Sequence, residues 1–277
     1  MSSPQLTPGS RHPIRVRRPD LPFDEEIPRH WADGNPVASH AFNALNLTFP
    51  DGERFFIRAV NDHLDAIEDP ELRKQARAFA GQEAVHGREH ERYFDVLRAQ
   101  GYRIDRFLEH FRRFVRISDR LPKSIRLAMT AGAEHYTATL GHFAVVNPEV
   151  RRFHPTMQAL IVWHAAEEVE HKAVAFDVMQ AAGISYATRI LGYLLASVSL
   201  LSWAAIAARM LLRQDRFTRR EVRAYHRELE QRADPEVIAH TKRQLRAYFR
   251  RDFHPNEVDD LELAHRRLEE IELVPAS

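Results

Sequence analysis

One stretch in the middle of the chain, WHAAEEVEHKAVAFDV from Trp163 to Val178, limits the possible folds more than any other. It places three glutamates and two histidines within eight residues, between apolar neighbours. An α-helix turns roughly 100° per residue, so residues three, four and seven apart share a face. His164, Glu168 and His171 then share an arc of about 60° with the apolar positions of the same helix. We therefore expect these three side chains to point into a core.

The same test finds three more helical segments that carry a glutamate on their apolar face. Glu83 and His86 share a face with Phe79 and Phe94, and the other two segments each contribute one glutamate. Four predicted helices thus each offer a core-facing glutamate, and two of them add a histidine three residues later. The set is Glu53, Glu83 with His86, Glu134, and Glu168 with His171.

Ionised side chains on buried faces need a physical reason, because an unpaired charge in a core is costly. One glutamate from each of two helices, with Glu-x-x-His from each of the other two, is the ligand set of a ferritin-like four-helix bundle with two metal ions. Four carboxylates balance the charge of two divalent ions, and imidazoles complete the coordination. The sequence therefore predicts an all-α, ferritin-like four-helix bundle with a dinuclear metal site.

Spacing alone is weak support, since the charged C-terminal segment also contains Glu-x-x-His at Glu262 and His265, where we expect a solvated helix. Within the central stretch, we expect Glu170 to point to solvent and Glu167 to lie at the flank of the buried face. His90 falls on the buried face of its helix.

The remaining chain also has helical spacing, with ten glycines in all and few strand-like alternations. We expect a loose N-terminal arm over residues 1–35, a metal-binding bundle over 36–183, a long apolar helix over 184–215 and charged helices over 216–277. Prolines and glycines predict helices at 36–47, 50–67, 70–100, 104–118, 122–146 and 148–183.

Composition narrows the class of protein. The chain has no cysteine, so any metal must be held by His, Asp and Glu, and disulfides are excluded. Lys and Arg number 40 against 39 Asp and Glu, which gives no net-charge argument for a nucleic-acid partner. The N-terminus lacks the apolar core of a secretory signal, so we expect a cytoplasmic protein.

The apolar run from Ile190 to Leu212 contains only one charged residue, Arg209, and is long enough to span a bilayer. Three interpretations stay open: a helix buried against the bundle or a homodimer partner, a helix lying in the membrane interface, and a true span. The amphipathic, Arg-rich segment 104–118 predicts an ordinary surface helix, or a second contact with anionic lipid if it lies beside the apolar run.

Four sequence blocks carry a resemblance to known proteins: FPDGERFF, QEAVHGREHERYF, GAEHYTA and WHAAEEVEHKAVAFDV. They resemble a bacterial family catalogued as "predicted metal-dependent hydrolase", roughly from Arg15 to Leu212. The order of glutamates and histidines is similar to that of ferritin-like di-iron proteins, and His164 resembles the extra histidine of p-aminobenzoate N-oxygenase. The resemblance implies these metal ligands: Glu53, Glu83, His86, Glu134, His164, Glu168 and His171. His90 and Glu167 would orient ligands or relay protons.

The resemblance implies two iron ions, with manganese or a mixed pair also compatible with these ligands. The expected function is an oxidoreductase that uses O₂ and an external electron donor to oxidise or oxygenate a small organic substrate. The alternative is a metal-dependent hydrolase whose two ions activate water. A ferroxidase or a structural metal-binding protein is the third interpretation.

Overall fold

The computed structural model describes residues 12–271, and their regular structure is helical apart from isolated bridges, such as the antiparallel one between Ala32 and Phe153. The prediction of an all-α chain is confirmed. The α-helices are α1 (Pro36–Asn46), α2 (Phe49–Asn61), α3 (Pro70–Ala99), α4 (Asp105–Ser118), α5 (Lys123–Val146), α6 (Pro155–His171), α7 (Val174–Ala181), α8 (Tyr186–Gln214), α9 (Arg219–Arg232), α10 (Pro235–Ala247) and α11 (Leu261–Glu270).

Helix ends follow the local signals of the sequence. At the start of α3, Pro70 occupies the first turn and the Asp69 carboxylate accepts hydrogen bonds from the next free backbone N–H groups. Gly101 follows α3 with φ +87°, and Gly183 follows α7 with φ +65°, a left-handed conformation that glycine adopts without strain. The predicted C-terminal limits of these helices therefore agree with the structure to within two residues.

Two predicted helices are divided. The segment 50–67 ends its α-helix at Asn61 and continues as a 3₁₀ turn, Leu64–Ala66. The segment 148–183 begins with a 3₁₀ turn, Pro148–Arg152, becomes α-helical only at α6, and breaks again at a turn of Lys172 and Ala173 before α7. Proline disfavours the helical conformation in the residue before it, and His154, which precedes Pro155 of α6, is not helical, with φ −53° and ψ 135°.

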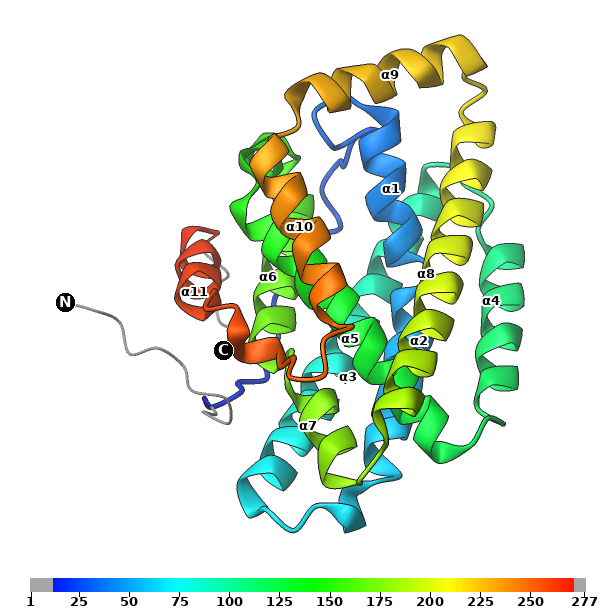
Figure 1. Cartoon of the computed structure of the whole chain (residues 1–277). Coiled ribbons are helices and arrows are strands. Elements are labelled where there is room, and N and C mark those ends of the chain that lie inside the picture. The colour runs from blue at the N-terminus through cyan, green and yellow to red at the C-terminus, as the bar shows by residue number, and fades with distance from the viewer. Residues whose placement is uncertain (1–11, 272–277) are drawn as a thin grey trace, which may run out of the picture.

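Helices α2, α3, α5 and α6 form the centre of the molecule (Figure 1). α2 packs against α3 and α5, while α6 packs against α5 and α3. Their inward faces bury large side chains that include Phe79, Leu127 and Trp163. These four helices are the ones predicted to carry glutamates on their buried faces.

The described part of the expected N-terminal arm, residues 12–35, lies against the bundle, and residues 1–11 fall outside the described range. Leu21, Ile27 and Trp31 are buried. The indole N–H of Trp31 donates to the Tyr93 hydroxyl of α3 at 2.9 Å and to Asn43 of α1 at 3.1 Å. This segment therefore covers the bundle core.

α8 runs along α5 and α1 at the edge of the bundle, with α4 beside it (Figure 1). The backbones of α5 and α8 approach closely, because a Cβ added to Gly192 would lie 2.4 Å from the carbonyl carbon of Ala128. Within residues 12–271, α8 is the helix long and apolar enough to cross a membrane, although a core helix can pass the same test. Only 22% of its most apolar window is buried.

The C-terminal helices return to the bundle. α9 crosses its end, α10 packs on α5, and α11 packs on α6 (Figure 1). A buried ion pair fixes this return, since Lys172 Nζ donates to Asp260 Oδ1 at 2.5 Å, next to α11. Residues 272–277 of the expected charged segment fall outside the described range.

Candidate metal centre

The seven predicted ligands converge inside the bundle. α2 contributes Glu53, α5 contributes Glu134, and α3 and α6 contribute the remaining five. None of the seven is more than 6% exposed.

One group joins Glu83, Glu134 and His171, whose ligand atoms lie within 4.8 Å of one another. His171 Nε2 is 3.1 Å from a Glu83 oxygen and 3.2 Å from a Glu134 oxygen. A Glu168 oxygen lies 3.4 Å from the same nitrogen. Three carboxylates therefore lie around one imidazole nitrogen of His171.

A second group of candidate ligand atoms lies beside the first and includes Glu53 of α2. His86 groups with Glu53 and Glu83 in one triad, and with His164 and Glu168 in another. His86 Nδ1 is 3.7 Å from Glu168 and 4.0 Å from Glu83. Glu83 and Glu168 thus approach the histidines of both groups, as carboxylates shared by two ions would.

The polar atoms at the centre lack protein partners. Both oxygens of Glu53, Glu83 and Glu134 are buried without a hydrogen bond, and so are one ring nitrogen of His86 and one of His171. Buried polar groups are ordinarily satisfied, and each exception needs an explanation. Hard carboxylate oxygens and imidazole nitrogens suit divalent iron or manganese. The residues present therefore fit a pair of metal ions.

Electrostatics lead to the same interpretation. Burial and mutual repulsion hold the pKa of Glu53 and Glu83 well above the usual value, and burial raises the pKa of Glu134 to about 7. Burial opposes the charge on Glu168, but His171 and His164 outweigh it, and the pKa of Glu168 lies well below its usual value. In the absence of metal, protons must replace part of the positive charge.

Two hydrogen bonds hold His86 and His171 on the side away from the centre. His86 Nε2 lies 2.9 Å from a Glu167 oxygen, which leaves Nδ1 facing the centre. His171 Nδ1 lies 2.9 Å from the Gln82 side-chain oxygen, which leaves Nε2 facing the centre. Such contacts fix the ring orientation and tautomer of a ligand. Glu167 is thus placed to orient His86.

Glu170 does not point to solvent, so that expectation is wrong. It is 4% exposed and accepts hydrogen bonds from Arg17 and Gln82. His265 Nε2 lies 2.6 Å from the same carboxylate, so this histidine of the C-terminal Glu-x-x-His contacts the bundle. The helical pattern places Glu170 correctly on the outer side of α6, but the N-terminal segment and α11 cover that side.

Sequence reasoning missed Arg17 and Gln82. Arg17 bridges Glu167 at 3.1 Å and Glu170 at 2.6 Å. Arg17 lies outside the helices, so helical spacing gave no signal for it. Gln82 sits four residues before His86 and next to Glu83, and its polar side chain on a buried helix was the available signal.

His90 lies as close to the other candidate ligand atoms as a direct metal ligand would. Its Nε2 is 2.5 Å from His164 Nδ1, and its ring groups with Glu53 and His164 within 4.8 Å. Burial and the neighbouring histidines hold the pKa of His90 well below its usual value, which favours the neutral imidazole. It could ligate an ion or hold His164 in place.

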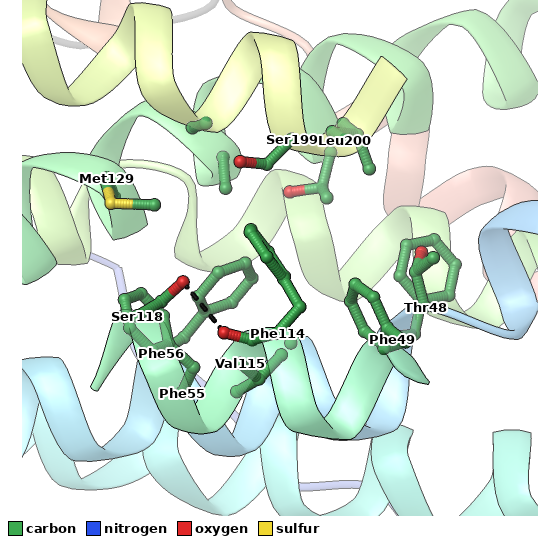
Figure 2. Close-up of a pocket in the computed structure, with 15 residues that line it drawn as sticks. Thr48, Phe49, Phe55, Phe56, Phe114, Val115, Ser118, Met129, Ser199 and Leu200 are labelled. Atoms are coloured by element: carbon green, nitrogen blue, oxygen red, sulfur yellow. Dashed lines mark hydrogen bonds between the residues drawn. The ribbon is translucent and has the colours of Figure 1, made fainter. Parts of the chain in front are cut away.

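One apolar pocket reaches the centre, and a second apolar pocket shares two lining residues with it. The inner one, about 490 Å³ including its mouth, is lined by His90, His164 and Glu168 among mostly apolar side chains. The outer one, about 670 Å³ including its mouth, lies between α2, α4, α5 and α8 (Figure 2). Phe49 and Thr137 line both pockets, so they form the wall between them.

A separate group of His30, His40 and Asp215 lies at the end of α8. The Asp215 carboxylate lies 2.5 Å from His40 Nε2 and 2.8 Å from His30 Nε2. It also accepts a hydrogen bond from the Tyr102 hydroxyl at 2.8 Å. Both oxygens are therefore satisfied by protein groups, which makes this cluster a link between helices.

Comparison of the sequence with models of known protein families found a match. The sequence matches the model of a family described as "predicted metal-dependent hydrolase" over residues 15–259. The match begins at the expected residue and extends beyond Leu212 into the charged C-terminal helices. The searches of curated proteins and of solved structures found no match. The family match spans most of the chain and includes every candidate ligand, so this protein belongs to the family of predicted metal-dependent hydrolases.

Proposed function

We propose that this protein is a dinuclear metal enzyme of the ferritin-like di-iron type, which uses O₂ to oxidise or oxygenate an apolar organic molecule. Two iron ions would be held by the seven residues predicted as ligands, with manganese or a mixed pair as chemically compatible substitutes. Bound iron supplies O₂ activation, and an external electron donor supplies the electrons.

The inner pocket carries this proposal. It brings apolar side chains of α1, α5 and α6 directly to three residues of the centre: His90, His164 and Glu168. A substrate held there would present carbon rather than a charged or strongly polar group, because the lining offers few polar partners. Oxidation suits such a substrate, whereas hydrolysis needs a polarised bond that the site can orient.

The side chains of this protein have defined tasks in the proposed reaction. Glu167 and Gln82 would fix the orientation of His86 and His171. Phe49 stacks near both His90 and His164, with ring centroids 4.9 and 4.7 Å apart, and would keep water from that side of the centre.

Hydrolysis is the second candidate, and the family description favours it. In that reaction the two ions would bind and activate a water molecule for attack on an ester or a related bond. The same ligands would serve, and the difference would lie in the substrate and in the need for O₂. Cytoplasmic location and the identity of the electron donor stay predictions.

The first experiment tests the site. Metal content is measured on protein purified without added metal, for the wild type and for the double variant Glu168→Ala/His171→Ala. About two ions per chain are expected for the wild type and fewer than one for the variant. The control is Glu262→Ala/His226→Ala, which removes one glutamate and one histidine from exposed positions of α11 and α9 and should keep the metal. Unchanged metal content in Glu168→Ala/His171→Ala would overturn the site.

The second experiment separates the two reactions. The iron-loaded protein is reduced without oxygen and mixed rapidly with O₂ while its absorption spectrum is followed. A transient that disappears in the metal-free double variant supports oxidation. The absence of any transient, together with metal-dependent cleavage of nitrophenyl acyl esters under anaerobic conditions, would replace the proposal by hydrolysis.

A further inference from the structure

The outward face of α8 is apolar, whereas a surface helix normally exposes polar residues. Val198 is 67% exposed and Leu201 59%. The exposed large apolar side chains of α8 up to Leu201 recur at intervals of three and four residues, and Ile206 follows Val198 by about two helical turns, so they share one face of the helix as an apolar stripe. They are Leu191, Leu194, Leu195, Val198, Leu201 and Ile206.

The rotation of α8 is fixed by its opposite face. The Cβ position of Gly192 lies against the backbone of Ala128. If α8 turned about its axis, a larger residue would replace Gly192 at this contact and would not fit. Ala207 and Leu211 are fully buried on the same side. The apolar stripe therefore faces outward because close packing against the bundle selects the other face.

Charge borders the stripe at one end. No carboxylate occurs between Asp177 and Asp215. Arg209 and Arg213, near the C-terminal end of α8, are exposed, and neither has an ion pair with another described residue. The helix thus presents apolar side chains followed by unpaired guanidinium groups.

α4 extends this surface. It runs antiparallel to α8, because Arg103 N donates to Gln214 at 2.8 Å while Phe111 and Phe114 pack on Trp203. Arg106 and Arg113 of α4 are exposed, and no ion pair joins either of them to a residue of the described range. α4, beside α8, therefore adds two exposed arginines to this side of the molecule, with the exposed Glu109 between them in the sequence.

We propose that the outward face of α8, with the adjoining arginines of α4, docks in the interface of a lipid bilayer that contains anionic lipids. Apolar side chains on one face and arginines at its border are the pattern of helices that lie in this interface. A second copy of the chain fits less well. At a two-fold contact through α8, the bordering arginines would meet a helix that offers no carboxylate to pair with them.

Docking would also place the outer pocket against the membrane. Ser199 and Leu200 of α8 and Phe114 of α4 line this pocket (Figure 2). Its other end shares Phe49 and Thr137 with the pocket that reaches the metal centre. A lipid-soluble molecule with an alkyl chain could then enter from the bilayer without crossing water. This part rests on the proposed function, whereas the docking itself does not.

The test is flotation of the purified full chain with vesicles. We expect the protein to float with vesicles of equal parts phosphatidylcholine and phosphatidylglycerol, and less with phosphatidylcholine alone or in high salt. Val198→Glu/Leu201→Glu should weaken this binding at least about tenfold, because two apolar contacts are replaced by anionic ones. The control is Ala224→Glu/Gln231→Glu, which adds carboxylates to exposed positions of α9.

A second readout locates the contact. Vesicles with brominated acyl chains should quench the fluorescence of Trp203, which lies on the α4 side of α8, but not that of Trp31 and Trp163, which are buried in the bundle. The quenchable component should disappear in Trp203→Phe. Metal content, measured on the same samples, should be equal in wild type and Val198→Glu/Leu201→Glu, which separates failed docking from a failed metal site.

Two other outcomes would overturn the proposal. The first is no flotation with either vesicle, or equal flotation of wild type and Val198→Glu/Leu201→Glu, because the contact would then lie elsewhere or not exist. The second is a dimer in solution that Val198→Glu/Leu201→Glu converts to a monomer without any vesicle binding. That result would make the face an interface between two copies of the chain.

Discussion

Replacement of Glu134 by glutamine should stabilise the metal-free protein and weaken its response to metal, two effects of opposite sign. Glu134 is 1% exposed, and neither of its oxygens has a hydrogen-bond partner. Glutamine keeps the shape of the side chain and removes the charge. His171, which lies 3.2 Å from Glu134, retains Glu83 and Glu168 as neighbours.

The magnitude follows from the pKa. Burial raises the pKa of Glu134 from 4.5 to about 7 in the folded protein. A carboxyl group whose pKa is raised on folding destabilises the folded protein when it ionises. This destabilisation is absent at a pH below the pKa of the unfolded state and complete at a pH above the pKa of the folded state. The cost to the free energy of unfolding is about 3 kcal/mol at pH 8 and under about 1 kcal/mol at pH 5. Glu134→Gln should recover most of it.

Bound metal reverses the sign. A divalent ion that binds only the folded state stabilises that state. The gain in the free energy of unfolding grows with the logarithm of the ratio between the metal concentration and the dissociation constant. The charged Glu134 is then a ligand instead of a cost, so its loss should reduce the rise in melting temperature caused by ferrous or manganous ions.

The assay is urea denaturation of chelator-treated protein at pH 5 and pH 8, and thermal melting with and without metal. Glu230→Gln, on the solvent side of α9, is the control and should leave both quantities unchanged. The reasoning fails if metal-free Glu134→Gln is less stable than the wild type at pH 8. It also fails if metal raises the melting temperature equally in both proteins.

Three further changes have definite expectations. Gly192→Ala should lower the free energy of unfolding in urea by about 1–3 kcal/mol because its Cβ would meet backbone at 2.4 Å, whereas Gly52→Ala, with no atom within 4 Å, should raise it by about 0.5 kcal/mol. Glu167→Gln should weaken metal affinity in a chelator competition about 10- to 100-fold while retaining the metal count at saturation, since it removes the carboxylate behind a histidine ligand. Asp260→Asn should lower the free energy of unfolding in urea by about 3 kcal/mol at pH 7, because Lys172 is left buried without its carboxylate partner. This loss should shrink as the pH falls through the lowered pKa of Asp260, and an equal loss at pH 3 and pH 7 would contradict the prediction.

Helical spacing and the chemistry of buried carboxylates were sufficient to predict the centre of the molecule. The faces of α2, α3, α5 and α6 follow from local periodicity, and a glutamate on such a face demands a counter-charge whatever the rest of the chain does. The convergence of Glu53, Glu134 and His171 in one core agrees with that argument. Their role as ligands stays a prediction until metal is measured.

Helix boundaries were less predictable. Pro148 and Pro155 both carry the signal of a helix start, and only the second begins an α-helix. Local rules allow either, because a proline fits both a 3₁₀ turn and the first turn of an α-helix. Contacts with the neighbouring segments select between them, and the bridge between Ala32 and Phe153 lies at this point.

The sequence by itself determined the helical class and the inward placement of the candidate ligands, because both depend on side chains a few residues apart on one helix. Only the tertiary structure decided what covers those helices. Glu170 is buried because Arg17 and His265, which are far away in the sequence, contact its carboxylate. Likewise, the apolar sequence of α8 is compatible with either a buried or an exposed helix. The close contact of Gly192 with α5 decides which side of α8 is buried, and the apolar stripe lies on the other side. Long-range packing leaves no periodic trace in the sequence, which is why these features appear only in the folded chain.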